Sequence, residues 1–302
     1  MDLHSFNIGL ALWFILLILE AVTGTFINAF IITILLHGYF RKQKMSDNDK
    51  ILITLSIKNI YSPLVCSAAL ILFFVWPQIN NEIYAMFGIF MLTIFSTISM
   101  FWLTACLCVF YFIKIVNFSC GILLWAKMKI RIVVPWLIFF SELVSLCWTF
   151  FTMLPLVNDK QSSQNSSSFF SGNTTSEANA AIFDLICIAV SLPLLIIIIT
   201  TFSTAGSLYL HRRRMEKNIG ASSSLKAHES AVWMMTHLLL LYTLVLVVQS
   251  LHFSGVFVPL SFGYCLNYII LFCFPLVQSV LLIKSNPKLK DKLKQISLVC
   301  SN

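Results

Sequence analysis

Seven long apolar stretches constrain the fold of this 302-residue chain more than any other feature. The hydrocarbon core of a bilayer is roughly 30 Å thick, so a helix that spans it needs about 20 mostly apolar residues. Lipid offers no partners to an exposed backbone N–H or C=O, so such stretches are helical. The sequence therefore predicts an all-α membrane protein, a single seven-transmembrane helix bundle within residues 1–302. The predicted helices cover residues 8–36, 51–76, 84–113, 132–156, 180–210, 231–253 and 260–283.

The composition supports this interpretation. Hydrophobic residues make up 59% of the chain and charged residues 11%, whereas soluble domains have about 45–50% apolar and about 25% charged residues. Length alone would allow two soluble domains. The first stretch is too long for a signal peptide and lacks a charged start and a small-residue cleavage site. We therefore expect residues 8–36 to be retained as the first helix.

The basic residues predict the orientation. Of the 20 lysines and arginines, only Lys58 and Lys160 lie outside the connections after the first, third and fifth stretches and the tail. Basic residues in short connections stay in the cytoplasm. The sequence thus predicts a multi-pass plasma-membrane protein with an extracellular N-terminus and a cytoplasmic tail at residues 284–302. The net charge of +8 then indicates contact with anionic lipid and an acidic cytoplasmic partner rather than nucleic acid.

The connection at residues 157–179 is predicted to be extracellular, and it carries two glycosylation acceptors, Asn165 and Asn173. The same pattern at Asn117 falls on the predicted cytoplasmic side and is discounted. None of the nine cysteines lies in a predicted outer connection. We therefore expect no extracellular disulfide.

Enzyme signatures are absent from the sequence. The six histidines show no metal-ligand spacing, and there is no glycine-rich phosphate loop and no GxSxG motif. We expect neither an enzyme nor a bound metal or cofactor.

Polar residues inside the apolar stretches are candidate functional groups. Asn28 and Asn59 both lie roughly 12 Å from the inner ends of their helices, at 1.5 Å per residue, so we expect a hydrogen bond between them. It is either plain interhelical bonding or part of a network that repacks on activation. Glu20 lies further out, so a direct pair with Lys58 is not expected. Glu142 lies inside the fourth stretch.

Asp184 lies about one turn into the fifth stretch from the predicted outer end. Water reaches this depth. Two interpretations remain open: the carboxylate pairs with a cationic amine ligand, or it is a solvated acid at a helix end.

One tract carries a specific family resemblance. Residues 102–119 read WLTACLCVFYFIKIVNFS, which closely resembles the end of the third helix in the type 2 (bitter) taste receptors. Further tracts resemble the same family in the same order along the chain: Glu20 to Asn28, His211–Met215, Ser224–His228, Leu239–Tyr242, and Pro275, Ser279 and Asn286–Lys290.

The resemblance implies a G-protein-coupled receptor with a short cytoplasmic C-terminal helix. It implies that small bitter molecules enter from the extracellular side and that a gustducin-type heterotrimeric G protein binds inside. The implied ligand residues, taken together with Asp184, are Thr93, Thr97, Tyr242 and Tyr268. The implied activation and coupling residues are Tyr111, Lys114, Arg212, Arg213, Arg214, Lys226 and His228.

The sequence departs from the family at several positions. Asn59 stands where the family has an arginine, with Lys58 beside it, and Gln278 stands where the family has a histidine. The chain thus resembles a divergent member. Two rival interpretations are a vomeronasal-type chemosensory receptor and a small-molecule transporter. The FYFIKI tract and the tail favour taste, and a transporter predicts paired intramembrane charges and inverted repeats, neither of which we detect in the sequence.

Overall fold

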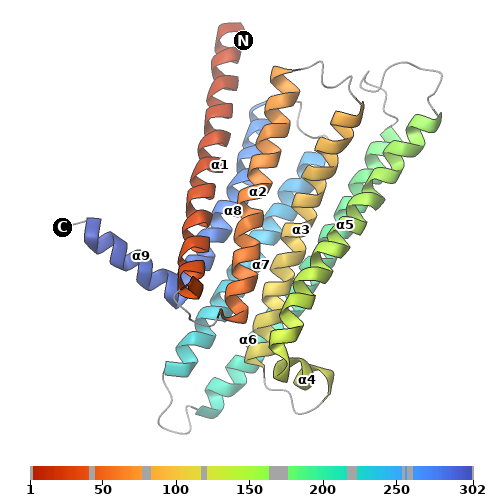
Figure 1. The fold of residues 1–302 in the computed structure, drawn as a ribbon. Helices are drawn as coiled ribbons and strands as arrows, with labels where there is room; N and C mark the ends of the chain where they lie inside the picture. Colours follow the sequence, from red (N-terminus) through yellow and green to blue (C-terminus); the bar gives the residue numbers. More distant parts are fainter. Residues whose placement is uncertain are drawn as a thin grey trace.

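Seven long helices run side by side in the computed structural model, and two shorter helices lie at one end of them (Figure 1). The structure describes residues 3–40, 45–76, 83–116, 121–162, 176–215, 223–253, 256 and 261–300. The helices within this part of the chain are α1 (Leu3–Phe40), α2 (Asp47–Val75), α3 (Ile83–Ile115), α4 (Ile122–Met128), α5 (Ile130–Ser162), α6 (Ser176–Met215), α7 (Ser223–Phe253), α8 (Phe262–Ser285) and α9 (Pro287–Cys300).

Seven of these helices, all except α4 and α9, are long and apolar enough to cross a membrane. The prediction of a seven-helix bundle is therefore confirmed. We call the end where α1 begins the amino end, and the end that carries α4 and α9 the basic end (Figure 1). The described basic residues of the tail and of the connections lie at the basic end; they include Lys50, Lys114, Arg131, Arg212 and Lys288.

The centre of the bundle is α3. Inside the structure, 67% of its apolar span is buried, against 17% for α5, and α3 contacts α2, α5, α6 and α7. A helix buried on all sides is apolar all round, which explains the long run of apolar residues between Ile83 and Ile115.

The two faces of α5 differ in side-chain size. The face toward the interior carries small hydroxyl residues, among them Ser141, Ser145 and Thr149, which are buried. Phe139 and Phe150 on the other face are more than half exposed. Because lipid is as apolar as a protein core, helices in membranes associate through close packing of small residues. This pattern places α5 against α3 and turns its aromatic side chains to the lipid.

Local signals fix several helix ends. Ser46 caps α2 in a reciprocal box with Asp49, each side chain accepting from the other's backbone N–H at 3.2 Å. Asn286 is the C-cap of α8, and Pro287 opens α9, since proline suits the first position of a helix. Lys288 Nζ lies 2.9 Å from Asp49 Oδ2, which ties the start of α9 to the start of α2.

The short helix α4 lies within a segment for which the sequence analysis predicts only a connection. Gly121 precedes it with a φ of 87°, a conformation that glycine adopts without strain. Lys127 Nζ donates to the Val116 carbonyl at 2.8 Å, which holds α4 beneath the end of α3.

Candidate functional site

A cavity of about 460 Å³ lies in the half of the bundle toward the amino end. Side chains from α2, α3, α6, α7 and α8 line it, and most of them are apolar or aromatic. None of the described lining residues is Asp, Glu, Lys, Arg or His. Cavities of this kind, mostly apolar with a few polar groups, are typical small-molecule sites.

Three of the residues expected at a ligand site lie together on the wall of this cavity: Thr93, Thr97 and Tyr268. Thr97 follows Thr93 by one turn of α3, and its hydroxyl donates to the Thr93 carbonyl at 3.0 Å. The Thr93 hydroxyl donates to the Ile89 carbonyl at 2.9 Å. Both threonine hydroxyls thereby donate their hydrogen bonds within α3, and their oxygen lone pairs remain as acceptors.

The wall near the amino end is aromatic. The Tyr264 hydroxyl donates to the Tyr268 hydroxyl at 3.3 Å. Trp13 of α1 packs edge-on against Tyr268, with ring centroids 5.9 Å apart. Trp13 is 3% exposed, so α1 supports the cavity wall from behind without lining it.

Gln249 of α7 is a lining residue that the sequence analysis missed. Its side-chain oxygen is buried and has no hydrogen-bond partner among the described residues. A buried acceptor without a partner costs free energy, so a ligand that donates a hydrogen bond would be favoured here. The sequence feature that could have identified Gln249 is its position as a polar residue within the apolar stretch 231–253.

Asp184 does not line the cavity, and its expected role as a ligand residue stays a prediction. The side chain is exposed, whereas Ile186 on the same helix lines the cavity. Two residues correspond to about 200° of rotation around a helix, so Asp184 faces away from the cavity. Of the two interpretations left open above, a solvated acid fits the exposed side chain, but α6 begins at Ser176 and Asp184 lies about two turns inside the helix.

Tyr242 lies beneath the cavity rather than on its wall, and its expected role in ligand binding stays a prediction. It is fully buried. Its ring meets Phe101 at 4.5 Å and Phe274 at 4.8 Å between centroids, and these two phenylalanines line the cavity floor. Tyr242 therefore contacts the cavity lining through the rings of these two phenylalanines.

The hydroxyl of Tyr242 belongs to a buried hydrogen-bond cluster. It donates to the Met100 carbonyl at 3.0 Å and lies in hydrogen-bond contact with the Thr104 hydroxyl. Gln278 Nε2 donates to the Thr104 hydroxyl at 2.7 Å. The cluster joins α3, α7 and α8, and the departure from the family at Gln278 is one of its members.

The expected hydrogen bond between Asn28 and Asn59 is indirect. Both side chains are fully buried and lie at similar depth, but Ser279 of α8 bridges them. Asn59 Nδ2 donates to Ser279 Oγ at 3.1 Å, and Ser279 Oγ donates to Asn28 Oδ1 at 2.8 Å. Depth along the helices placed the two asparagines at the same level, but rotation about the helix axes leaves room for α8 between them.

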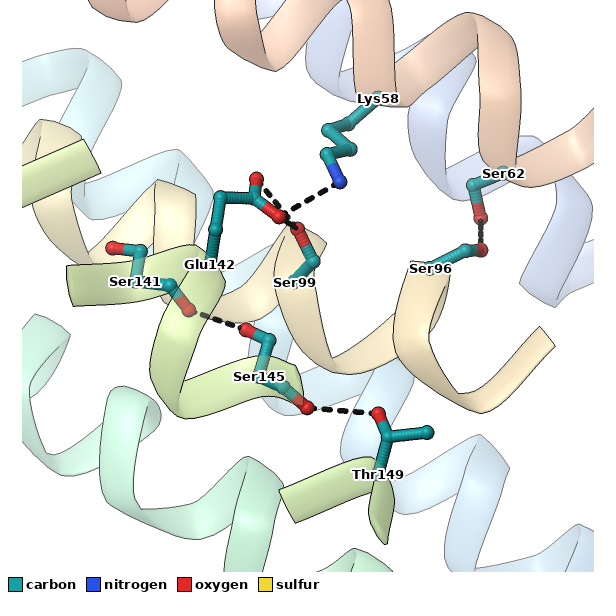
Figure 2. Close-up of polar contacts among 8 residues, drawn as sticks. All are labelled: Lys58, Ser62, Ser96, Ser99, Ser141, Glu142, Ser145 and Thr149. Carbon is teal, nitrogen blue, oxygen red and sulfur yellow. Dashed lines mark hydrogen bonds and ion pairs between the residues drawn. The ribbon is translucent and has the colours of Figure 1, made fainter. Parts of the chain in front are cut away.

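Lys58 pairs with a residue that the sequence analysis did not propose as its partner. Its Nζ lies 2.9 Å from Glu142 Oε2, and Ser99 Oγ lies 3.0 Å from each carboxylate oxygen (Figure 2). The statement that the chain has no paired intramembrane charges was therefore wrong, and that argument against a transporter no longer holds. Glu20 does not reach Lys58; Cys273 Sγ donates to its carboxylate at 2.9 Å.

The residues expected to couple to a partner gather at the basic end. Arg212 and Arg213 are exposed, and Arg212 lies 3.7 Å from Glu229 of α7. Lys114 is exposed at the end of α3, with Nζ 5.7 Å from the centre of the Phe110 ring. Tyr111 and His228 are half-buried. Asn165 and Asn173 lie outside the described residues, as do the side chains of Arg214 and Lys226.

No three His, Cys, Asp or Glu side chains converge as metal ligands anywhere in the described part of the chain. Seven described cysteines are free thiols. The described lining of the cavity offers apolar contacts and neutral hydrogen-bonding groups.

Comparisons with known proteins agree with this arrangement. The chain matches the profile of the taste receptor protein family (TAS2R) over residues 6–301. It is 30% identical to taste receptor type 2 member 40 of Gallus gallus over 297 residues, which is 93% of each chain. It is 27% identical to taste receptor type 2 member 39 of Macaca mulatta and 26% identical to member 39 of Homo sapiens, with 98% of this chain covered in both and 88% and 89% of those relatives.

The match extends over nearly all of a bundle whose seven apolar helices suit a multi-pass membrane protein. The expected family is confirmed: the chain belongs to the type 2 taste receptors, the bitter-taste family of G-protein-coupled receptors.

Proposed function

We propose that this receptor binds small bitter compounds in the 460 Å³ cavity from the extracellular side and activates a gustducin-type heterotrimeric G protein at its basic end. In this proposal the protein lies in the plasma membrane. Its N-terminus is extracellular and its tail is cytoplasmic. Asn165 and Asn173 carry glycans.

The observation that carries the proposal is the position and chemistry of the cavity. Five helices enclose it in the half of the bundle that the distribution of basic residues assigns to the outside. Its described lining holds no charged side chain, and its polar groups are hydroxyls, a thiol and the amide of Gln249. A neutral, largely apolar molecule with one or two hydrogen-bonding groups fits this chemistry better than an amine cation.

A route for coupling leads from the cavity floor toward the basic end. Phe101 and Phe274 on the floor pack against Tyr242, and the cluster around Tyr242 includes Gln278. The next residue, Ser279, joins α8 to α1 and α2. A ligand biases a receptor only through its different affinities for two arrangements. In this proposal the two arrangements differ in how the residues along this chain of contacts pack against one another.

The basic end supplies the surface for the acidic partner. Lys114, Arg212 and Arg213 are exposed there, and exposed charges of one sign steer an oppositely charged partner. If ligand and G protein are coupled, each raises the affinity for the other by the same factor.

The test is a concentration–response screen of bitter compounds in cells that express the receptor with a gustducin-type reporter. We expect at least one neutral compound to activate the wild type. Thr97→Ala and Tyr268→Ala should raise its half-maximal concentration (EC50) by about tenfold with little change in surface amount, the scale of a removed ligand contact.

A size-matched pair sharpens the test. Thr97→Trp fills the cavity and should abolish the response, whereas Leu92→Trp should retain it, because Leu92 lies on α3 but is 49% exposed toward lipid. No response to any compound, with the wild type present at the surface, would reject the proposal. Compound uptake without G-protein activation would favour the transporter alternative instead.

A further inference from the structure

An ion pair near the middle of the bundle joins two helices across a third. Lys58 lies near the middle of the span Asp47–Leu72, and Glu142 lies near the middle of the span Ile130–Pro155. Their side-chain N···O distance is 2.9 Å. Ser99 of α3 contacts both carboxylate oxygens at 3.0 Å (Figure 2). We call Lys58, Ser99 and Glu142 the polar clamp.

The clamp has an apolar setting. Lys58 Nζ lies 4.4 Å from the centre of the Phe95 ring and 5.9 Å from that of Tyr61. The Lys58 side chain is 15% exposed and that of Glu142 is 28% exposed, and what lies outside at this depth is hydrocarbon. A lone charge at this depth is costly, so each member of the pair compensates the other.

The clamp acts on the side of α3 that faces away from the cavity. Ser99 follows Thr97 by two residues, about 200° around the helix, and neither Ser99 nor Lys58 nor Glu142 lines the cavity. A rotation of α3 about its axis would break the bonds of Ser99 and turn Thr97 away from the cavity wall at the same time.

A second contact supports the same alignment. Ser96 Oγ donates to Ser62 Oγ at 2.9 Å, and Ser62 lines the cavity on α2 (Figure 2). The helix α3 is thus held by polar contacts to α2 at Ser96 and to α5 at Ser99, within one turn of Thr97.

We propose that Lys58 and Glu142 are positioning residues for ligand recognition: through Ser99 they fix the rotation of α3 that presents Thr93 and Thr97 to the cavity. The proposal rests on the cavity being the ligand site of the proposed function. The pair touches no ligand, and its removal therefore changes the potency of agonists through the orientation of α3.

The first variant keeps both charges. Ser99→Ala removes only the hydroxyl that links α3 to the pair. At equal surface amount we expect its EC50 to rise about threefold to tenfold, the scale of one or two interhelical hydrogen bonds in a membrane. Ser56→Ala is the matched control, because Ser56 is fully buried and its hydroxyl has no partner among the described residues. It should leave the EC50 unchanged.

The charged pair is tested by removal and reversal. Lys58→Met or Glu142→Gln alone leaves one charge unpaired, and both variants should lose most of their surface expression. Lys58→Met combined with Glu142→Gln should recover surface expression. Its EC50 should nevertheless be raised above that of the wild type, as in Ser99→Ala. The reversed pair, Lys58→Glu with Glu142→Lys, should bring the EC50 back to within about threefold of the wild type.

An agonist-free measurement reports the orientation of α3 directly. Thr97→Cys should react with a small water-soluble thiol reagent that enters the cavity, and the parent receptor corrects for Cys66, which also lines it. Adding Ser99→Ala should change the reaction rate of Cys at position 97 by about threefold or more.

Four outcomes decide the proposal. Raised EC50 and altered thiol reaction in the Ser99→Ala variant support it. Wild-type EC50 and wild-type thiol reaction in both Ser99→Ala and the neutral double variant overturn it, as does a reversed pair that keeps the EC50 of the neutral double variant. If no agonist activates even the wild type, the proposed function fails, and the thiol reaction alone decides whether the clamp positions α3.

Discussion

The ring of Tyr242 stands edge-on to the ring of Phe101, with centroids 4.5 Å apart and planes at 89°. Phe101 lies on the cavity floor, and the Tyr242 hydroxyl bonds to the Met100 carbonyl below it. This contact between rings, together with that between Tyr242 and Phe274, joins the apolar site to the buried polar cluster. Edge-to-face aromatic pairs contribute about 0.5–1.5 kcal/mol beyond their buried area. A displacement of Phe101 therefore changes the packing of Tyr242.

Removal of the hydroxyl and removal of the ring of Tyr242 should have different costs. Tyr242→Phe loses the bonds to Met100 and Thr104, and we expect the free energy of unfolding to fall by about 1–2 kcal/mol. Tyr242→Ala also leaves a cavity at a fully buried position, which costs about 3–5 kcal/mol. Thermal unfolding of the purified receptor measures both. A wild-type free energy of unfolding in Tyr242→Phe would show that the hydroxyl cluster contributes nothing of its own.

Ser279 should contribute more to stability than a serine buried in the same bundle without a partner. Ser279→Ala breaks the bridge between Asn28 and Asn59, and we expect a loss of about 1–2 kcal/mol. Ser67→Ala is the control, since Ser67 is buried and its hydroxyl has no partner among the described residues. Unfolding of the two purified variants should differ accordingly, and a control that loses as much as Ser279→Ala would contradict the bridge.

Neutralising Asp184 should leave ligand recognition unchanged. The side chain is exposed and points away from the cavity. Asp184→Asn should therefore keep the EC50 of neutral and of cationic agonists within about twofold. Such a change corresponds to a smaller free energy than that of one hydrogen bond. Concentration–response curves provide the measurement. A tenfold loss confined to cationic agonists would restore the amine-binding interpretation and move the site outward along α6.

Charge at the basic end should govern signalling rather than folding. Arg212→Gln combined with Arg213→Gln should lower the maximal G-protein response at unchanged surface amount, because both side chains are exposed and act on a partner. Glu229→Gln breaks the contact of 3.7 Å with Arg212. Surface ion pairs contribute about 0–1 kcal/mol, so this control should fold like the wild type. A loss of surface amount in the arginine variant would contradict a signalling role.

Glycosylation reports the orientation of the bundle. Asn165→Gln and Asn173→Gln should each remove one glycan, seen as a step in electrophoretic mobility that endoglycosidase treatment of the wild type reproduces. Asn117→Gln should change nothing, since α3 ends at Ile115 at the basic end and this end is the predicted cytoplasmic side. A glycan that depends on Asn117 would reverse the predicted topology.

The sequence predicted the helices well because the signal for a membrane span is length and apolarity, and both are local. It also predicted the depth of Asn28 and Asn59, because each residue adds a fixed rise along a helix. Thr93 and Thr97 followed from the family resemblance and share one face at a spacing of four. These expectations needed only positions along a helix axis.

Rotation about the axis was not predictable in the same way. In a soluble helix the apolar stripe marks the buried face, but here both the lipid and the interior are apolar, so the pattern of hydrophobic residues does not say which face is inside. For that reason the sequence did not show that Asp184 faces away from the cavity. It also did not identify Ser279 and Glu142 as partners of Asn59 and Lys58. The partner of a buried polar group depends on helix packing, which the sequence pattern alone does not give.

The most direct test of the central claim is to find where an agonist binds. A photoreactive analogue of an activating compound, cross-linked to the purified receptor and mapped by mass spectrometry, should label α3 around Thr97 and α8 around Tyr268, two walls of the same cavity. Excess unmodified agonist should prevent the labelling. Competable labelling that is confined to the lipid face of α5, near Phe139 and Phe150, or to the basic end would contradict the account.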